Sequence, residues 1–523
     1  MIITEILARN ARMYTDEIAL VEREPARGSR REITWQEFDQ MANLVANALI
    51  AGGIKKGDRV ILLMMNCLEW LPLYFGILRT GAWAVPLNFR FTAKDIRYCG
   101  EISEAKIIIF GEEFIDRMNI NERTLEGATG YIFVGPDNSR PDYAVSLNNF
   151  LRGASEKDPS IPLTILDDAA LYFTSGTTGT PKPILLTHRN LEASGIVDNM
   201  AHKQVHKDIF LTIPPLYHTG AKINCFGSFI VGGRVVILKG VKPGWIIEAV
   251  SQEQITIAFL LVPWAQDILV AIENGEIKLE DHKLDQWRLM HIGAQPVPPS
   301  LIKKWKTLFP NQDYDTTYGL SECTGPGCIN LGIENSHKVG AIGKPGFDWE
   351  ARVVDGGLND VPRGHTGEIM VKGPGVMKEY YKNPKATHET IKDGWLLTGD
   401  IARIDEDGFI WIVDRKKDVI ISGGENVFPI EVENFLMENK KVQDAGVIGI
   451  PDERLGEIVA AVVQTKPGVV MTEEEMLDYC ESLPRYKRPK KIFFGDVPRN
   501  PTGKIEKPRL RETYSGTRES FKL

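Results

Sequence analysis

The chain has 523 residues, enough for roughly three to four structural units of about 150 residues each. Hydrophobic residues make up 43% and charged residues 25%, as in ordinary globular proteins, which excludes a disordered tail, a collagen-like rod and a disulfide-stapled miniprotein. The formal net charge of −8 argues against a nucleic-acid-binding protein and favours one that handles small molecules.

The six cysteines are too few for a disulfide framework, and no Cys-x-x-Cys pair suggests a zinc ribbon or a redox dithiol. The first residues lack the basic and then apolar pattern of a signal peptide. The apolar stretches 70–78 and 257–265 are too short to cross a bilayer, and each contains a proline. We therefore expect free thiols, no membrane span and a cytoplasmic location.

Short apolar runs such as residues 59–65 alternate with segments of helical periodicity, which predicts α/β layers with parallel sheets. From about residue 340 to 414 the chain is rich in glycines and short strands, which suits a β-rich unit. The charged residues 415–418 resemble a linker, and residues 419–523 show the pattern of a compact α+β unit. We expect a large N-terminal domain, residues 1–414, of two α/β subdomains and a β-rich one, a hinge at 415–418, and a small C-terminal domain.

Residues 174–182 combine hydroxyl side chains, two glycines and Lys182, directly after the strand-like run 169–173. Glycines let backbone N–H groups approach an anion, hydroxyls donate further hydrogen bonds, and the lysine adds a positive charge. The segment is not a Walker A sequence, because the spacing from glycine to lysine differs. It predicts a phosphate-binding loop, and a flexible surface loop is the alternative.

This loop resembles the signature of the superfamily of acyl-CoA synthetases, adenylation domains and luciferases, which are AMP-forming adenylating enzymes. Further motifs of that superfamily match in the same order along the chain. They are residues 318–322 (Tyr-Gly-Leu-Ser-Glu), 394–400, the hinge segments 414–418 and 421–426, and 501–505.

The resemblance implies an AMP-forming carboxylate–CoA ligase that uses ATP, Mg²⁺, CoA and a small carboxylic acid. It also implies that the small C-terminal domain is mobile. Two alternatives remain open: an enzyme of the same fold that passes its adenylate to a carrier protein or to oxygen, and a nucleotide-binding pseudoenzyme. A homodimer is compatible with the sequence.

By the same resemblance, Tyr318 packs against adenine, and Asp400 and Arg415 reach the ribose. Without it, Tyr318 would be a core tyrosine, and the other two an ion pair. The positions assigned to ATP and AMP binding are Thr174, Ser175, Gly176, Thr177, Thr178, Gly179, Lys182, Gly293, Ala294, Gln295, Tyr318, Gly319, Ser321, Asp400 and Arg415.

Three residues are assigned to catalysis. The resemblance implies that Lys504 stabilises the charge that develops when the carboxylate attacks the α-phosphate. Without it, a lone lysine in such a turn would be a solvent-exposed residue. Glu322 is a Mg²⁺ ligand, because hard cations bridge carboxylates and phosphates; a solvated glutamate is the alternative. His218 orients the acyl group or gates the thiol tunnel, and a structural histidine is equally compatible.

Lys417 matches the position about which the small domain reorients. Gly423 and Gly424 resemble the pair that lines the tunnel for the pantetheine arm of CoA. Pro183 departs from the glycine that the superfamily has after the lysine, and because proline removes an N–H, the exit of the phosphate loop must differ.

The residues assigned to the acyl pocket are Tyr217, His218 and Trp264. Segment 214–220 lacks the aspartate that amino-acid-activating relatives use, which disfavours an amino-acid substrate. Trp264, Phe226 and Phe229 suggest an apolar pocket, and no cationic residue obviously awaits a second carboxylate. The sequence therefore favours a fatty, alicyclic or aromatic monocarboxylate.

Overall fold

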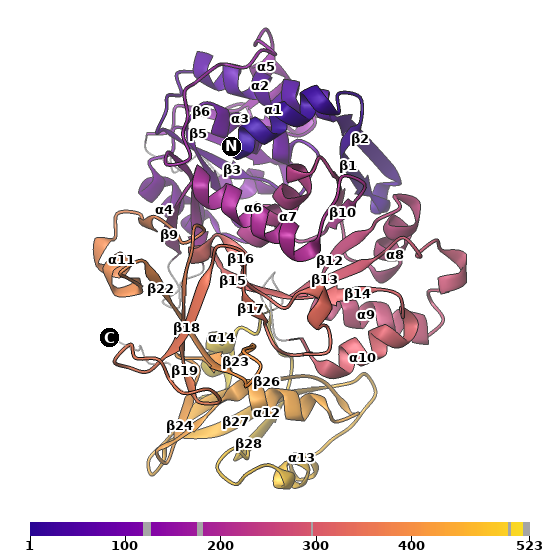
Figure 1. Ribbon diagram of the computed structural model, residues 1–523, viewed down its shortest axis with the longest axis vertical. Coiled ribbons are helices and arrows are strands. Elements are labelled where there is room, and N and C mark those ends of the chain that lie inside the picture. The colour runs from indigo at the N-terminus through magenta and orange to yellow at the C-terminus, as the bar shows by residue number, and fades with distance from the viewer. Residues whose placement is uncertain (119–126, 175–180, 294–296, 500–503, 516–523) are drawn as a thin grey trace.

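The structure is a computed structural model that describes residues 1–118, 127–174, 181–293, 297–499 and 504–515. Figure 1 shows two large sheets with their helices in the upper part, a β-rich part below them, and a C-terminal unit at the bottom.

One sheet has eight strands in the order β20-β9-β8-β4-β3-β5-β6-β7. Its central pairs are parallel, whereas β8–β9 and β9–β20 are antiparallel. Its strands are β3 (Arg59–Leu63), β4 (Trp83–Pro86), β5 (Ile107–Gly111), β6 (Gly130–Val134), β7 (Val145–Ser146), β8 (Asp168–Thr174), β9 (Lys182–Thr187) and β20 (Glu379–Tyr380).

The other large sheet has seven strands in the order β14-β13-β12-β10-β11-β1-β2, and all its pairs except β1–β2 are parallel. Its strands are β1 (Ile18–Glu24), β2 (Ser29–Thr34), β10 (Ile209–Thr212), β11 (Arg234–Leu238), β12 (Ile257–Leu261), β13 (Leu289–Gly293) and β14 (Asp313–Asp315).

Ten helices belong to these two sheets in the part of the chain that the structure describes. They are α1 (Ile3–Met13), α2 (Trp35–Ala51), α3 (Trp70–Arg79), α4 (Ala93–Ser103), α5 (Leu147–Leu151), α6 (His188–His202), α7 (Thr219–Ile230), α8 (Pro243–Gln252), α9 (Val262–Glu273) and α10 (Pro299–Leu308). Several begin at a threonine whose hydroxyl accepts a backbone N–H three residues on; Thr34 and Thr187 cap α2 and α6 in this way.

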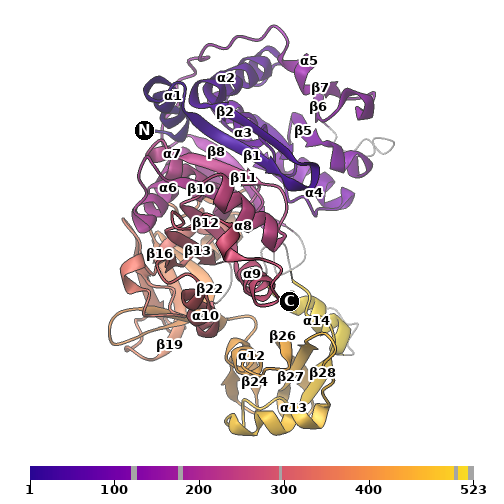
Figure 2. The ribbon, with the colours of Figure 1, turned by 90° about the vertical axis from the view of Figure 1, so that its right-hand side faces the viewer.

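Alternate residues of each strand enter different cores, which makes a layered structure. Val60 and Leu62 share a core with α2, α3 and α7 and with the seven-stranded sheet, whereas Ile61 and Leu63 pack on the far side with α4. The opposite face of the seven-stranded sheet packs against α8, α9 and α10. One helical layer therefore lies between the two sheets, and further helices cover each outer face (Figure 2).

The β-rich part follows. A three-stranded sheet contains β15 (Thr317–Leu320), β16 (Gly325–Asn330) and β17 (Lys344–Pro345). A five-stranded sheet contains β18 (Glu350–Val354), β19 (Thr366–Lys372), β21 (Ile391–Lys392), β22 (Trp395–Ile404) and β23 (Ile410–Arg415), with α11 (Pro384–Thr390) beside it. One element of this region departs from the expected β-rich unit, because β20 adds to the eight-stranded sheet through β9.

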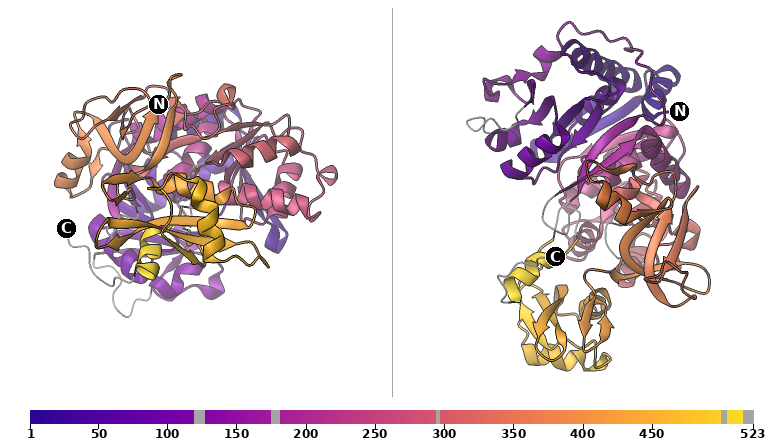
Figure 3. Two further views of the ribbon diagram at one scale, coloured as in Figure 1. Left: turned by 90° about the horizontal axis from the view of Figure 1, so that it is seen from below. Right: turned by 90° about the vertical axis from the view of Figure 1, so that its left-hand side faces the viewer.

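The C-terminal unit has its own core, built from residues between Ile420 and Ile492. Figure 3 shows this unit in yellow at one end of the molecule. Its elements are β24 (Ile420–Ser422), β25 (Glu425–Val427), α12 (Pro429–Met437), β26 (Val442–Asp452), β27 (Gly456–Thr465), α13 (Glu473–Tyr479), β28 (Lys491–Phe494) and α14 (Lys507–Tyr514).

The mixed α/β class with a large N-terminal part and a smaller C-terminal one is as expected from the sequence. The division at residues 415–418 stays a prediction. All six cysteines are free thiols. Within the described ranges, no helix is both long and apolar enough to cross a bilayer.

Candidate active site

Asp400 is the centre of a network that joins three segments. The Tyr318 hydroxyl donates to Asp400 Oδ2 at 2.5 Å, and Arg415 Nε forms an ion pair with Oδ1 at 2.9 Å. The antiparallel pairing of β22 and β23 places Arg415 directly opposite Asp400, which explains the contact. Burial and the Asp400 charge raise the pKa of Tyr318, so this hydroxyl stays protonated and donates. Three of the expected nucleotide-binding residues therefore meet.

Gly319 lies within the hairpin of β15 and β16. A Cβ atom there would come within 2.0 Å of the Gly325 carbonyl oxygen, so only glycine permits the close approach. Ser321 begins the short 3₁₀ turn Ser321–Cys323 that follows β15 and carries Glu322. The hairpin thus places Tyr318 and Glu322 at its two ends.

Glu322 lies beside the end of the phosphate-loop hairpin. The Tyr380 hydroxyl donates to Glu322 Oε1 at 2.8 Å, and Lys182 Nζ lies 5.2 Å from the centre of the Tyr380 ring. Lys182 pairs with Thr174 across β8 and β9, so the two ends of the loop lie side by side. The loop residues Ser175, Gly176, Thr177, Thr178 and Gly179 are outside the described residues.

Pro183 is accommodated without loss of strand pairing. It lies opposite Phe173 in the β8–β9 ladder, and its carbonyl oxygen accepts the Tyr381 N–H at 2.9 Å. The second position of β9 thus keeps a hydrogen bond to the residue that follows β20, although proline has no N–H of its own.

Lys504, a residue of the C-terminal part of the chain, interacts with this network. It interacts electrostatically with Asp400, Glu322 and Arg415. Its side chain keeps exposed surface, yet the surrounding protein and the Arg415 charge lower the pKa of Lys504 to about 8. The C-terminal unit is therefore arranged with this lysine facing the Asp400 network.

His218 is the residue directly before α7, and its ring lies 5.8 Å from that of Tyr217. Burial, with the charges of Lys504 and Lys222, lowers the pKa of His218 to about 4, so its imidazole is neutral near pH 7. Tyr217 also contacts Phe89 edge to face at 5.7 Å. Both expected pocket residues therefore lie on the loop that leads into α7.

Gly293 and Trp264 lie at one end of the seven-stranded sheet. Gly293 pairs with Leu261, and Trp264 follows three residues after that strand on α9. Ligands of open parallel sheets bind at the carboxyl ends of the strands. Ala294 and Gln295, expected beside adenine, are outside the described residues.

Gly423 and Gly424 form the two-residue turn between β24 and β25, with φ values of 60° and 86°. Positive φ at both positions requires residues such as glycine, so the turn alone explains this pair. Lys417 lies in the turn between β23 and β24. The contact of the glycines with CoA and the role of Lys417 as a pivot stay predictions.

Comparison with known proteins identifies the family. The family described as AMP-binding enzyme matches residues 7–381, and the AMP-binding enzyme C-terminal domain matches residues 431–504. This chain belongs to the AMP-binding enzyme family.

Relatives in this family are similar along nearly their whole length. The chain is 33% identical over 489 residues to the long-chain-fatty-acid–CoA ligase FadD13 of Mycobacterium tuberculosis H37Rv, covering 93% of this chain and 94% of the relative. It is 33% identical over 486 residues to a feruloyl-CoA synthase of an Amycolatopsis species, covering 92% and 94%.

Solved structures of the family share the fold. ATP-bound MatB from Rhodopseudomonas palustris superimposes with a TM-score of 0.88 at 30% identity, covering 99% of each chain. The anthranilate–CoA ligase AuaEII with anthranoyl-AMP superimposes with a TM-score of 0.89 at 26% identity, covering 98% and 97%. The expected fold class is thereby confirmed.

No sequence pattern pointed to two further residues near the site, Tyr380 and Lys222. Tyr380 orients Glu322, but it lies in the short strand β20, and no local sequence pattern predicts the pairing of this strand with β9. Lys222 on α7 is 1% exposed, and its Nζ lies 4.1 Å from the ring centre of Tyr172, with the rings of Trp70 and Tyr74 at 5.4 and 4.9 Å. The lysine lies on the helix that also carries Phe226 and Phe229.

The surroundings of Lys222, Phe226 and Phe229 show how the side chains of α7 are buried. Phe226 and Phe229 are fully buried against rings of α2 and α3, so they belong to the central core. Lys222 Nζ has no hydrogen-bond partner among the described residues. A buried lysine thus lies near His218, and because burial lowers the pKa of its amine, it does not contradict the expectation that no cation awaits a second carboxylate there.

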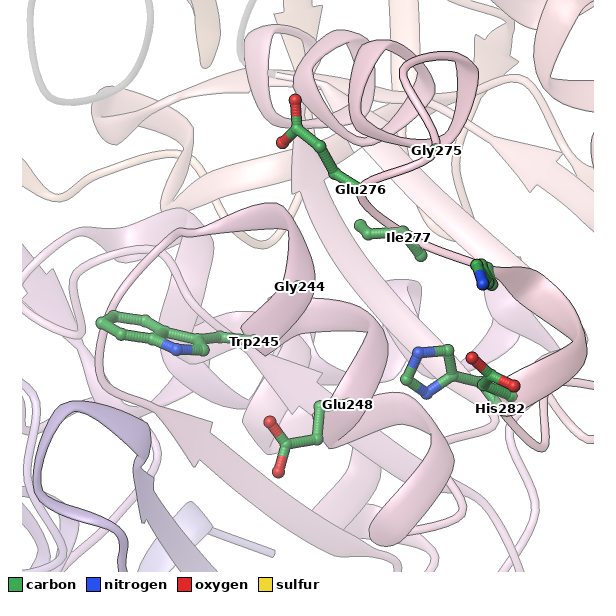
Figure 4. Close-up of a pocket in the computed structure, with 9 residues that line it drawn as sticks. Gly244, Trp245, Glu248, Gly275, Glu276, Ile277 and His282 are labelled. Atoms are coloured by element: carbon green, nitrogen blue, oxygen red, sulfur yellow. The ribbon is translucent and has the colours of Figure 1, made fainter.

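A surface pocket lies apart from these residues, between α8 and the segment after α9 (Figure 4). Its lining residues are Gly244, Trp245, Glu248, Gly275, Glu276, Ile277, Lys278, Asp281 and His282. None of the residues expected in the active site lines it.

The buried Lys222 generates a prediction about stability. Burial lowers the pKa of Lys222 well below its ordinary value of 10.5. Between the lowered pKa and about 10.4, the unfolded chain binds a proton that the folded chain has lost, so the free energy of unfolding rises with pH. Lys222→Met should remove this contribution, and the melting temperature of the variant relative to wild type should be higher at pH 7 than at pH 9.

The exposed Lys440 serves as the control, because Lys440→Met should leave the difference from wild type unchanged with pH. An equal offset between Lys222→Met and wild type at both pH values would contradict the argument.

Proposed function

We propose that this protein is an AMP-forming carboxylate–CoA ligase. It converts ATP, a carboxylic acid and CoA to acyl-CoA, AMP and pyrophosphate through an acyl-adenylate. The relatives named above are CoA ligases, and they cover this chain almost completely.

The observation that carries the proposal is the approach of Lys504 to the Asp400 network. Tyr318 offers an aromatic face for adenine, and Asp400 and Arg415 offer groups for the ribose. Lys504 supplies a positive charge where negative charge builds up on the α-phosphate as the acid attacks it. Residues from both parts of the chain are then needed for the first half-reaction.

Glu322 fits a Mg²⁺ ion that accompanies ATP. Its Oε1 accepts the Tyr380 hydroxyl, while Oε2 makes no hydrogen bond within the described part of the chain. A carboxylate oriented in this way suits Mg²⁺, which neutralises phosphate charge when bound. Lys182 adds a further cation at the end of the phosphate loop.

We propose that the second half-reaction needs a different arrangement of the C-terminal domain, residues 419–523. A turn about Lys417, within the hinge 415–418, would withdraw Lys504 and bring Gly423 and Gly424 to the site for the CoA thiol. The two half-reactions would then depend on different surfaces of one domain.

For the substrate, we favour a fatty, alicyclic or aromatic monocarboxylate. FadD13 is named for long-chain fatty acids and another relative for feruloyl-CoA, so both aliphatic and aromatic acids occur among similar proteins. His218 is neutral near pH 7 and can contact a carboxylate by hydrogen bonding. A cytoplasmic location and a homodimer stay predictions.

The reaction is tested with purified protein and a panel of fatty, aromatic and dicarboxylic acids. We expect pyrophosphate release that depends on the acid, and a thioester when CoA is added. Lys504→Ala should lower adenylation by at least about 100-fold, because a preorganised charge is lost, and should spare thioester formation from supplied acyl-AMP.

The exposed Lys440→Ala is the matched control on the same part of the chain. Pyrophosphate release without any thioester would replace the ligase by another acceptor, such as a carrier protein. Equal loss of both half-reactions in Lys504→Ala would contradict the two arrangements.

The pKa of Lys504 predicts a pH dependence. Because kcat/KM reports the ionisation of the free enzyme, kcat/KM of adenylation should fall about tenfold per pH unit above about pH 8. Saturating ATP should move the fall in kcat to higher pH, since the phosphates favour the ammonium form. Lys504→Arg should be slower but flat through this range, because guanidinium stays charged. A fall at the same pH in Lys504→Arg would assign it to another group.

Tyr380 provides a test of the Mg²⁺ role of Glu322. Tyr380→Phe keeps the ring beside Lys182 but removes the hydroxyl from Glu322, so the Mg²⁺ concentration for half-maximal adenylation should rise by about tenfold. Tyr381→Phe is the control, since the Tyr381 ring packs on Trp83 at 5.4 Å. An unchanged Mg²⁺ requirement in Tyr380→Phe would remove Glu322 from the metal site.

A further inference from the structure

A cluster of two histidines and an aspartate lies buried behind the nucleotide site. His202 ends α6, His291 lies in β13, and Asp315 ends β14; their exposed fractions are 0%, 1% and 0%. His291 and Asp315 are partners in the β13–β14 register, so their side chains leave the same face of the sheet. None of these residues takes part in the reaction proposed above.

The three side chains point ligand atoms at a common place. His202 Nε2 lies 3.1 Å from His291 Nδ1 and 3.4 Å from Asp315 Oδ2, and all three atoms lie within 4.8 Å of one another. Two ligands at about 2.0–2.1 Å from a tetrahedral Zn²⁺ are themselves about 3.3 Å apart. The two short separations therefore match the spacing of metal ligands.

The surroundings orient these atoms in the way that metal sites require. Asp198 Oδ1 lies 3.5 Å from His202 Nδ1, on the ring edge opposite Nε2, and Gln204 Nε2 donates to Asp198 Oδ2 at 3.1 Å. A carboxylate behind a histidine commonly fixes the tautomer that ligates a metal. The Gly332 N–H donates to Asp315 Oδ1 at 2.9 Å, whereas Oδ2 has no hydrogen-bond partner among the described residues.

The balance of charge also favours a cation. Asp198 and Asp315 are both buried, and one proton on His202 would leave a net negative charge in the interior. The nearby Arg288 is bound to Asp208 at 2.7 Å. A divalent ion with two neutral histidines would balance both carboxylates, which removes the cost of an uncompensated buried charge.

We propose that His202, His291 and Asp315 bind one divalent transition-metal ion, with Zn²⁺ the best match to two imidazoles and one carboxylate. The site is distinct from the Mg²⁺ position at Glu322. It ties α6 to β13, which ends at Gly293, and to β14, which the chain leaves toward Tyr318. These residues supply three ligands, so a tetrahedral ion would take water as its fourth. The ion holds the adenine side of the nucleotide site.

The first test measures metal content of the full chain, expressed with added zinc and dialysed without Mg²⁺ or ATP. Elemental analysis should find about one zinc per chain. Protein stripped with a chelator should bind one equivalent of ZnCl₂ and melt at a higher temperature when it does. Stripped protein should also take up Co²⁺ with the visible absorption of a tetrahedral ion.

Variants then locate the ion. His291→Leu and Asp315→Asn should weaken Zn²⁺ uptake by more than about 100-fold, since each removes a direct ligand. His388→Gln, on the exposed surface of α11, should bind as wild type does. If the variants do not fold, the stoichiometry and the Co²⁺ spectrum of wild type decide the proposal.

Two results would overturn it. The first is wild type that carries no metal, takes up neither Zn²⁺ nor Co²⁺ and melts at the same temperature with a chelator. The cluster would then hold a proton in place of a metal ion. Burial lowers the pKa of His202, but Asp198 and Asp315 raise it to about 10. Binding that persists in both folded variants would place the metal elsewhere.

Discussion

The candidate active site depends on the buried carboxylate of Asp400, which contacts both Tyr318 and Arg415. This carboxylate accepts a hydrogen bond from the hydroxyl of Tyr318 on one oxygen and forms an ion pair with the guanidinium of Arg415 through the other, and only 5% of Asp400 is exposed. Burying a carboxylate destabilises the folded state unless both of its oxygens have partners, so loss of either contact would destabilise the site. Tyr318 follows β14 of the seven-stranded sheet, and Arg415 ends β23 and is the first residue of the predicted hinge. One side chain thus links the layered part, the β-rich part and the start of the hinge.

A second group of charges links the predicted hinge, residues 415–418, to the segment that bears Lys504. Asp418 accepts from Arg511 at 2.9 Å, and Lys507 Nζ lies 3.0 Å from Glu433 Oε1. Lys507 is 7% exposed and lies three residues after Lys504, so the ion pair of Lys507 restrains the backbone near Lys504. Asp414 accepts the Ile430 N–H at 2.9 Å across the hinge. All these contacts are ionic or hydrogen-bonded.

The layers explain why the polar groups gather where they do. The two large sheets are buried on both faces, and the residues expected in the nucleotide site lie mostly at or beyond the ends of their strands, where ligands of open parallel sheets bind. Gly293 and Trp264 lie at or just beyond such ends, and Tyr318 follows β14 closely. The β8–β9 hairpin, which flanks the predicted phosphate loop, belongs to the other sheet, and β20 pairs with β9. The site therefore assembles from both sheets and from the β-rich part.

Local pattern was sufficient for much of this protein. The apolar run at 59–65 predicted β3, Pro429 predicted the start of α12, and the motif order predicted the family and fold. These features depend on neighbouring residues or on short motifs. Tyr380, Lys222 and the cluster of His202, His291 and Asp315 had no such signal. The two histidines are 89 positions apart, and strand register and helix packing alone bring them to 3.1 Å. The sequence by itself determined the elements and the chemistry of the motifs, because periodicity and backbone preference act locally. Only the tertiary structure decided which distant polar groups share one buried space, because register and packing are properties of the whole chain.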